Sequence, residues 1–348
     1  MIEGPRIAID AMGGDVGPEV MVAGAADARA DFDNLSYSFF GDEAAIAVEI
    51  AKHKSLSEGV KIVHTDGVIS GDDKPSQAIR RAKDSSMGLA IAAVKAGEAD
   101  AALSGGNTGA LMAMAKLALR TMEGIDRPAI SALLPTLGDN DVVMLDLGAN
   151  TECDAENLVQ FAVMGAAYAR IVLDIERPRT ALLNIGSEDQ KGTGLLKDAA
   201  ARLRAADAIP LEFTGFIEGD RLSRGHVDVI VTDGFSGNIA LKTVEGTARF
   251  VADLIRRAFT SSIRSKAGFM LSRPAAKLLR NTLDPNNHNG GVMLGLNGLV
   301  VKSHGGADAN GVRNAIDVAA KMAMADITRR ISEDLENFPE QAIKDAAE

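Results

Sequence analysis

The amino-acid sequence predicts an α/β protein with a doubly wound, mainly parallel sheet. Short apolar, β-rich runs recur along the 348 residues, and each ends in glycine and small polar residues. An Ala- and Leu-rich stretch with helical spacing follows each run, which is the pattern of parallel strands joined by helices. No repeat of fixed period and no Pro/Ser-rich linker divides the chain, so we expect a single α/β domain over residues 1–336.

The expected elements follow one another along the whole chain. Strands are predicted at 6–10, 37–40, 61–64, 101–104, 129–134, 142–147, 180–185, 211–216, 227–232 and 298–302. Helices are predicted at 18–30, 43–54, 76–95, 108–122, 155–174, 194–205, 238–262 and 310–334. The helical stretches repeat apolar residues every three or four positions, whereas the strand runs are short and apolar. Residues 337–348 have little to bury, and we expect them to form a frayed tail.

Composition and charge exclude several classes of protein. The chain carries 37 Lys and Arg against 48 Asp and Glu, a net charge of −11, which argues against a nucleic-acid binder that relies on basic residues. Apolar residues make up 46% and charged residues 24%, values of a folded globular protein rather than a disordered one. Cys153 is the single cysteine, so neither an internal disulfide nor a thiolate metal cluster is expected.

The same features predict a cytoplasmic location. A lone cysteine is typical of a reducing compartment, and the first residues lack the basic and apolar regions of a signal peptide. No run reaches the ~20 apolar residues that cross a bilayer. Any contact with a membrane is therefore expected to be peripheral.

Six of the expected strand ends combine glycine with small polar residues. They lie at 10–15, 104–109, 146–151, 184–187, 232–238 and 303–308. Because ligands of an open parallel sheet bind outside the carboxyl ends of its strands, we expect these loops to converge on one crevice. Backbone N–H groups and helix N-termini there suit a small oxyanion such as phosphate. None of the loops matches the dinucleotide or P-loop fingerprint, and any one of them alone is typical of a simple turn.

Five segments taken together resemble the bacterial phosphate acyltransferase (PlsX) family. They are residues 7–15, 72–87, 104–112, 146–152 and 232–238, and the resemblance extends from residue 6 to about 335 in the family's order. It implies an enzyme that transfers a long acyl chain from acyl carrier protein to inorganic phosphate, giving acyl phosphate for phospholipid synthesis. It also implies a homodimer with a fold of the isocitrate/isopropylmalate dehydrogenase-like and phosphotransacetylase-like type.

The implied reaction is the attack of a phosphate oxygen on a thioester carbonyl. Phosphate is largely dianionic near neutral pH and thiolate leaves readily, so the enzyme needs positioning and charge stabilisation rather than a strong base. The resemblance assigns catalytic roles to Lys191, which would stabilise negative charge, and Asn238, which would donate a hydrogen bond to the phosphate or the oxyanion. The alternatives are a solvated loop lysine and a helix N-cap asparagine.

The expected substrate site needs no metal and no cofactor. The five histidines show no metal-ligand spacing, and the donor is the thioester of acyl carrier protein itself. The residues expected to bind phosphate or substrate are Gly13, Gly14, Ser104, Gly105, Gly106, Asn107, Thr108 and His304.

A basic arm is predicted at 249–285. Residues 249–280 hold eight Lys or Arg and a single Asp, a net +7, with apolar residues at helical spacing. A basic amphipathic helix suits an anionic membrane surface or an acidic carrier protein, although its apolar stripe could equally form a dimer interface. The expected contact residues are Arg256, Arg257, Phe259, Ile263, Arg264, Lys266 and Phe269.

Three other functions stay open beside acyl transfer from acyl carrier protein. One is a phosphotransacetylase-like enzyme that uses acyl-CoA, and another, less favoured, is a dehydrogenase of similar architecture. The third is a membrane scaffold that binds carrier protein without turnover. Contact with the membrane could also be indirect, through a downstream glycerol-3-phosphate acyltransferase.

Overall fold

The computed structural model describes residues 4–32, 34–206 and 208–336. Its strands are β1 (Arg6–Asp10), β2 (Ser36–Gly41), β3 (Val60–His64), β4 (Ala101–Ser104), β5 (Ala129–Leu134), β6 (Val142–Leu145), β7 (Arg179–Leu183), β8 (Glu212–Ile217), β9 (Val229–Val231), β10 (Gly291–Leu294) and β11 (Leu299–Lys302). Its α-helices are α1 (Pro18–Ala28), α2 (Glu43–Ile50), α3 (Pro75–Arg80), α4 (Ser86–Lys95), α5 (Thr108–Leu119), α6 (Ala155–Val172), α7 (Gly194–Arg204), α8 (Gly234–Thr260), α9 (Ile263–Leu271), α10 (Arg273–Leu283), α11 (Ala309–Met324) and α12 (Ile327–Glu336).

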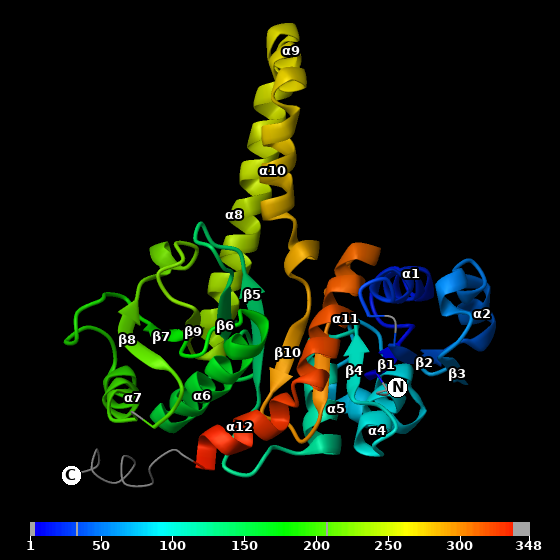
Figure 1. The fold of residues 1–348 in the computed structure, drawn as a ribbon, viewed down its shortest axis with the longest axis horizontal. Coiled ribbons are helices and arrows are strands. Elements are labelled where there is room, and N and C mark those ends of the chain that lie inside the picture. The colour runs from blue at the N-terminus through cyan, green and yellow to red at the C-terminus, as the bar shows by residue number, and fades with distance from the viewer. Residues whose placement is uncertain (1–3, 33, 207, 337–348) are drawn as a thin grey trace.

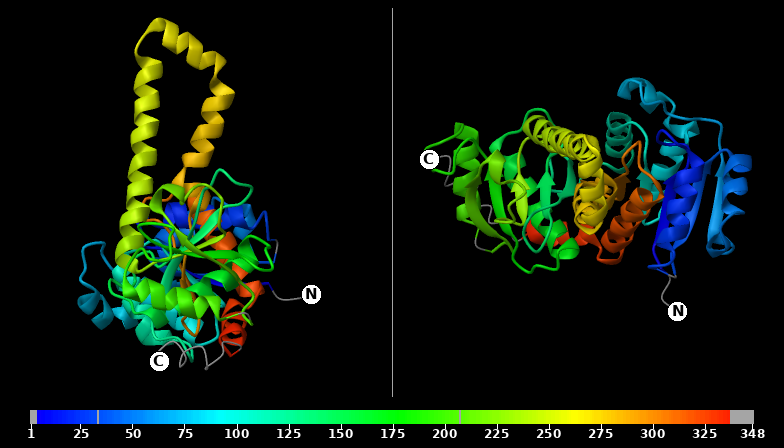
Figure 2. Two further views of the ribbon diagram at one scale, coloured as in Figure 1. Left: turned by 90° about the vertical axis from the view of Figure 1, so that its left-hand side faces the viewer. Right: turned by 90° about the horizontal axis from the view of Figure 1, so that it is seen from above.

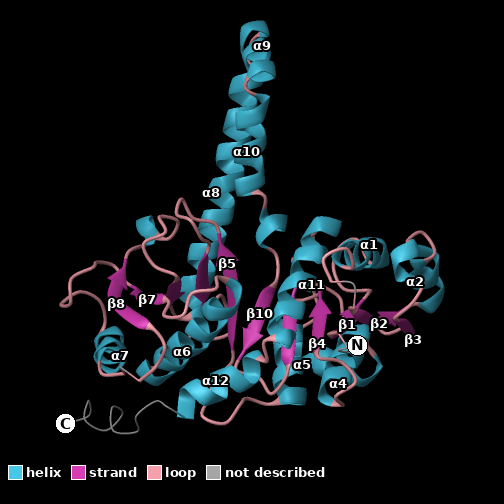
Figure 3. Cartoon of the chain, viewed as in Figure 1, coloured by secondary structure: helices cyan, strands magenta, loops and turns pink. Residues whose placement is uncertain are grey.

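One sheet crosses the molecule in the order β3-β2-β1-β4-β11-β10-β5-β6-β9-β7-β8 (Figures 1 and 3). Within the described residues, seven strand pairings are parallel and three are antiparallel, which confirms the mainly parallel sheet. The three antiparallel pairings are consecutive, β11 with β10, β10 with β5, and β5 with β6. The two parallel halves on either side of them therefore run in opposite directions.

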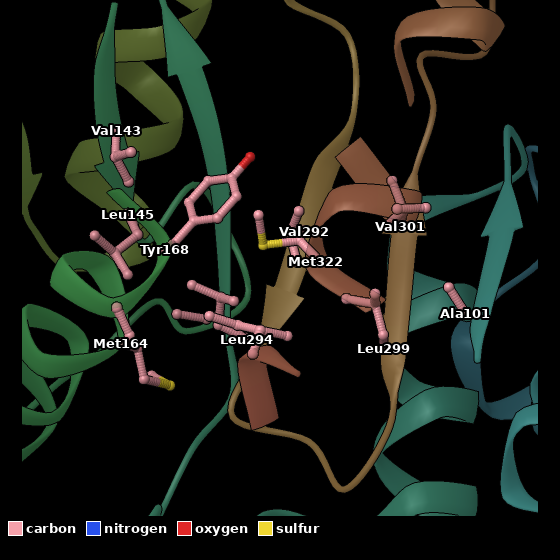
Figure 4. Packing of buried hydrophobic residues seen from close by; sticks show 14 of the residues in the cluster. Ala101, Val143, Leu145, Met164, Tyr168, Val292, Leu294, Leu299, Val301 and Met322 are labelled. Carbon is pink, nitrogen blue, oxygen red and sulfur yellow. The ribbon is translucent and has the colours of Figure 1, made fainter. Parts of the chain in front are cut away.

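Both faces of the sheet are packed against helices. Along β1, Ile7 and Ile9 belong to one buried cluster while Ala8 belongs to another, because successive residues of a strand point to opposite faces. On one face, Tyr168 of α6 and Met322 of α11 lie close to β10 in the middle of the sheet (Figure 4). Inner strands such as β4, β6 and β9 are buried on both sides, as their sequence predicted, whereas the outermost strands β3 and β8 are partly exposed.

Two expected helices are interrupted. The predicted helix 76–95 divides into α3 and α4, since Ser85 caps α4 by accepting a hydrogen bond from the Gly88 N–H at 3.2 Å. A Cβ on Gly88 would lie 1.8 Å from the Ala82 carbonyl oxygen, so the chain can turn this tightly only with glycine. The predicted helix 310–334 divides at Asp326, whose φ of 49° lies in the left-handed region.

Strand β10 was not predicted from the sequence. Its four residues are bounded by Gly290 and Gly295, both at positive φ, and the strand forms a hairpin with β11. Its residues Val292, Met293 and Leu294 are apolar and buried, but three apolar residues between glycines are too few to show a strand pattern. Without it the reversal of strand direction in the middle of the sheet could not be anticipated.

The basic arm consists of the outer part of α8 together with α9 and α10. It projects from the body, with α9 at the far end (Figures 1 and 2). Of the 27 residues of α8, Gly234 and Gly237 are the buried ones, and both lie in its first turn. Within the described residues, no helix is long and apolar enough to cross a membrane.

The turn before α4 can be tested with Gly88→Ala. The added methyl group has to displace the Ala82 backbone, so we expect the free energy of unfolding to fall by about 1–3 kcal/mol in a denaturant titration. Gly194→Ala is the control, because no atom lies within 4 Å of a Cβ built there. Equal stability of the two variants would contradict the proposed close contact.

Candidate active site

A cavity of about 790 Å³ is bounded by α5, β5, α8 and residues 282–291. Much of its lining is apolar and comes from α5, β5 and α8. These apolar residues are Met112 and Ala113 of α5, Ile130, Ala132 and Leu134 of β5, and Leu241, Val244 and Ala248 of α8. Its polar lining includes Thr108, Asn238, Lys302, Ser303 and His304. Its volume lies within the range of small-molecule binding sites.

The glycine-rich loops form two groups rather than one. Because the halves of the sheet run in opposite directions, the loops after β1, β4 and β11 lie at one edge, and those after β6, β7 and β9 lie at the other. The expectation that all six loops converge on one crevice was therefore wrong, since the loops at 10–15 and 184–187 do not line the cavity. Four of the six loops nevertheless line the cavity. Helix α8 connects the two loop groups, because its residue Asn238 belongs to the second group and its residue Glu245 lies beside His304 of the first group. Seven residues of helix separate these two positions by about 10 Å.

The first loop group packs backbone against backbone. A Cβ on Gly14, whose φ is 98°, would lie 3.0 Å from the Gly305 carbonyl oxygen, and one on Gly13 would lie 2.4 Å from Asp10 Oδ2. Gly105 and Gly106 complete the contact, because a Cβ on Gly105 would lie 3.1 Å from the Gly13 carbonyl oxygen. The structure thus brings the predicted glycines together, and a side chain at Gly13 or Gly14 would separate the loops.

Asp10 and Ser104 are buried beneath this glycine cluster. The Ser104 hydroxyl donates to Asp10 Oδ2 at 2.6 Å and accepts the Gly106 N–H at 3.0 Å. Burial raises the pKa of Asp10, and its Oδ1 has no hydrogen-bond partner among the described residues. Ser104 therefore positions the loop from below and lies outside the cavity lining.

Asn107 and Thr108 begin helix α5 and differ in role. Asn107 is the N-cap, since its Oδ1 accepts the Ala110 N–H at 3.0 Å while its Nδ2 donates to the Gly71 carbonyl at 2.6 Å. Both ends of the amide are thus engaged in structure. Thr108 is exposed and lines the cavity, so it can contact a ligand.

Asp146 organises the second loop group. Its buried carboxylate accepts backbone N–H groups of Ile130, Gly148, Ala149 and Asn150 at 2.7–3.2 Å. A Cβ on Gly237 would lie 1.9 Å from the Asp146 carbonyl oxygen, so the first turn of α8 packs directly on this loop. The contact requires glycine both at Gly237 of α8 and at Gly148 of the loop, since a Cβ on Gly148 would lie 2.8 Å from Asn238 Nδ2.

Asn238 lies in the cavity beside this loop. Its Nδ2 donates to the Leu147 carbonyl at 3.1 Å. The N-cap of α8 is Asp233, whose carboxylate accepts the Ser236 N–H at 2.8 Å, so the N-cap alternative for Asn238 was wrong. The side chain of Asn238 is exposed and can donate to a ligand.

Lys191 lies outside the cavity lining, in the loop after β7. Its backbone N–H donates to the Glu188 carbonyl at 2.9 Å, its carbonyl accepts from Asn184 Nδ2 at 3.3 Å, and its side chain is exposed. Because β7 neighbours β9, this loop is on the same edge of the sheet as Asn238. The structure places the two expected catalytic residues on one edge, and Asn238 alone lines the cavity.

His304 and Lys302 complete the cavity on the side of the first loop group. His304 is exposed, its Nδ1 accepts the Gly306 N–H at 3.3 Å, and partial desolvation of the ring lowers its pKa, which favours the neutral ring. Lys302 was missed by sequence reasoning, although it ends an apolar run directly before the Ser303 loop. His288, another lining residue, has its Nδ1 3.0 Å from Asp141 Oδ2.

Two features of the described residues concern metal ligands and the single thiol. The described residues contain no group of three His, Cys, Asp or Glu side chains that could hold a metal ion. Burial raises the pKa of the Cys153 thiol to about 11, so the thiol is protonated at neutral pH.

Solved structures identify the architecture. A phosphotransacetylase from Streptococcus pyogenes superposes with a TM-score of 0.62 at 18% identity, over 93% of this chain and 95% of that chain. EutD phosphotransacetylase from Staphylococcus aureus gives a TM-score of 0.59 at 16% identity, over 92% and 94% of the two chains. The protein is therefore an α/β protein of phosphotransacetylase-like fold with a large cavity across its central strands.

Sequence comparison identifies the family. The family model described as "Fatty acid synthesis protein" matches residues 5–330. "Phosphate acyltransferase" of Erythrobacter litoralis is 61% identical over 337 residues, which cover 97% of this chain and 95% of that protein. The protein of the same name from Rhodospirillum rubrum is 51% identical over 329 residues, or 94% of each. The chain belongs to this phosphate acyltransferase family and is an acyltransferase.

The role of Asp146 can be tested with Asp146→Asn. The amide keeps one acceptor oxygen but places an NH2 group where the other carboxylate oxygen now accepts a backbone hydrogen bond, so a donor would face a donor and we expect the free energy of unfolding to fall by about 2–3 kcal/mol. Urea titration measures the loss. Asp139→Asn is the matched control, since it removes the same charge from an exposed loop. A loss no greater than in the control would show that the hydrogen bonds contribute little.

Proposed function

We propose that the protein transfers a long-chain fatty acyl group from acyl carrier protein to inorganic phosphate, giving acyl phosphate for phospholipid synthesis. The cavity is the observation that carries this proposal. Its apolar lining suits a hydrocarbon chain, and its polar residues, such as Asn238 and Thr108, suit a thioester carbonyl and a phosphate. The donor thioester supplies the reactive bond, so no cofactor is required.

The proposed step is a direct displacement. A phosphate oxygen attacks the thioester carbon, the C–S bond breaks, and the thiolate leaves and takes a proton from solvent. Asn238 donates a hydrogen bond to the carbonyl oxygen as negative charge develops there, a form of stabilisation that is stronger in a desolvated site. Lys191 stabilises charge from the same edge of the sheet. Since its side chain is exposed, it reaches the reacting atoms through movement of its loop or through the position of the bound donor.

The phosphate is proposed to bind at the first loop group. The glycine contacts at Gly13, Gly14, Gly105 and Gly106 hold three strand ends together, and Thr108 and His304 face the cavity beside them. The N-terminus of α5 adds a positive dipole end. Ser104 and Asn107 act from beneath by fixing this backbone.

The basic arm is proposed to contact acyl carrier protein, an anionic membrane surface, or both. Arg256, Arg257, Arg264 and Lys266 are exposed, while Phe259 packs against Phe269 with ring centroids 5.2 Å apart. At the end of the arm, 88% of Ile263 and 87% of Leu271 are exposed. Exposed apolar residues amid arginines suit an interfacial anchor, and basic residues also attract an acidic partner.

Assembly and location complete the proposal. We expect a homodimer, since the apolar residues Phe250 and Leu254 of α8 are left exposed along the arm. The enzyme would be cytoplasmic and peripherally bound to the membrane, where it supplies acyl phosphate to a downstream glycerol-3-phosphate acyltransferase.

Phosphate-dependent release of free carrier protein from an acylated carrier protein tests the proposed activity. Lys191→Ala is expected to reduce this release by about 100-fold or more, by analogy with the loss of one oxyanion donor, while the fold remains intact. Lys197→Ala removes an exposed lysine of α7 and serves as the control. Near-normal turnover of Lys191→Ala would remove Lys191 from the mechanism. If the unaltered protein released no carrier protein, the proposed function would fail, and turnover of acyl-CoA alone would favour the phosphotransacetylase-like alternative.

Flotation with liposomes tests the arm. The unaltered protein should float with anionic vesicles, since each Lys or Arg near such a surface contributes about 1 kcal/mol. The double variant Ile263→Asp/Leu271→Asp should stay in solution, because it places two carboxylates at the end of the arm. Leu117→Asp, which changes an exposed leucine of α5 on the body, is the control, and light scattering reports whether each variant keeps its assembly state. Absence of flotation for the unaltered protein would refute the membrane contact.

A further inference from the structure

Lys302 occupies a distinctive place in the first half of the sheet. It is the last residue of β11 and lies beside Ser104 of β4, which in turn lies beside Asp10 of β1. Three polar residues thus stand in a row at the carboxyl ends of three adjacent parallel strands. Lys302 is the member of the row that lines the cavity.

The ammonium group of Lys302 has neutral oxygen atoms as partners. Its Nζ donates to the Gly105 carbonyl at 3.1 Å and to the carbonyl of Ser303. No carboxylate of the described ranges lies within ion-pair distance of it. The nearby carboxyl of Asp10 is engaged by the Ser104 hydroxyl, and burial raises its pKa, which favours its uncharged form. Among the described residues the ammonium group of Lys302 therefore forms no ion pair, although Asp10 and Asp15 lie near enough to raise its pKa.

A partly buried cation that forms no ion pair, at the edge of a cavity, favours a bound anion. Transfer of a charge out of water is costly unless an opposite charge or hydrogen bonds replace the lost hydration. Thr108 and Gly109, the first residues of the 12-residue helix α5, line the same cavity, and the helix dipole adds positive potential there. The one acidic side chain that α8 contributes to the lining, Glu245, is paired with Lys242 at 3.0 Å.

We infer that Lys302 binds the phosphate that attacks the thioester, through a charge-assisted hydrogen bond from Nζ. The inference rests on the proposed function and adds to it a cation that neither the motifs nor the family resemblance indicated. Gly105 and Ser303 position the ammonium group by accepting two of its hydrogens, which leaves the third for a phosphate oxygen. Lys191 and Asn238 then act on the thioester, and Lys302 acts on the nucleophile.

The environment of Lys302 also predicts a pH dependence. Burial lowers the pKa of Lys302 to about 8, and this effect outweighs the raising effect of the nearby carboxyl groups of Asp10 on β1 and Asp15 in the following loop. Lys242 on α8 lowers the pKa further, and the neighbouring His304 is favoured in its neutral form. Below pH 8 the ammonium group is charged and can bind phosphate. As the pH rises through about 8 it loses its proton, so the KM for phosphate should increase.

Steady-state kinetics with inorganic phosphate as the varied substrate tests this role. Lys302→Met should raise the KM for phosphate about 10- to 100-fold, the effect of losing one charge-assisted hydrogen bond, with a smaller change in kcat. Lys302→Arg retains its charge at alkaline pH, so the rise in KM above about pH 8 should disappear. Lys95→Met, which removes an exposed lysine of α4 outside the cavity, should leave the KM within about twofold.

Binding of phosphate without turnover gives an independent readout. The Tm of the unaltered protein should rise with phosphate concentration, and that of Lys302→Met should not. If Lys302→Met does not fold, as judged by circular dichroism, the pH profile of Lys302→Arg decides.

The outcomes separate this inference from the proposed function. An unchanged phosphate KM in Lys302→Met, or an alkaline rise that persists in Lys302→Arg, would overturn the role of Lys302 while acyl phosphate is still formed. A Lys302-dependent rise in Tm together with no turnover of any acyl donor would support the anion site and refute the proposed reaction.

Discussion

The antiparallel pairing of β11, β10, β5 and β6 is the constraint on which the rest of the structure depends. Three successive antiparallel pairings turn the second half of the sheet against the first, so the carboxyl ends of the two halves open at opposite edges. A site built from both halves then needs an element that passes from one edge to the other. Helix α8 is that element, since Asn238 lies beside the Asp146 loop and Glu245 lies beside His304. The cavity lies across the central strand β5 for the same reason.

Close backbone contact holds each edge together. Gly14 packs on the Gly305 carbonyl, and Gly237 packs on the Asp146 carbonyl, so a side chain at either position would separate two segments that the site requires. The buried acids differ in what they hold. Asp146 is surrounded by backbone N–H donors, whereas Asp10 is paired with a hydroxyl and keeps one oxygen without a partner among the described residues. Both edges are thus held by hydrogen bonds to a buried acid, and the acid of the first edge has one oxygen atom, Asp10 Oδ1, without a hydrogen-bond partner among the described residues.

Sequence patterns predict those parts of the fold that depend on residues close together in the chain. Apolar runs followed by glycine indicate strand ends, and the predicted strands mostly lie within a few residues of those observed. Strand direction is a property of pairing between distant segments, and β10 has too few residues between its glycines to show a pattern, so the opposed halves were not predicted.

Side-chain roles depend on the same distant contacts. Asn107 resembles a ligand-binding residue in a glycine loop, yet both ends of its amide are engaged by backbone. Lys302 resembles a solvated strand end, and it becomes notable only when β11 is placed beside β4.

The uneven distribution of charge along the chain suits the binding of anions by a protein that is acidic overall. Outside residues 249–280 the chain carries a net −18, which disfavours the approach of phosphate or of an acidic carrier protein to most of the surface. At physiological ionic strength exposed charges are screened beyond about 8 Å, whereas charges removed from solvent are screened much less. Lys302 is partly buried and held by backbone carbonyls, so its field acts on the cavity at short range with little opposition from the acidic surface. A folded macromolecular partner cannot enter the cavity and meets the outer charges instead, and the arm concentrates positive charge far from the acidic body (Figure 1). In the proposed function, a small anion and a large anionic surface would therefore be bound at two separate cationic sites, one lining the cavity and one on the projecting arm.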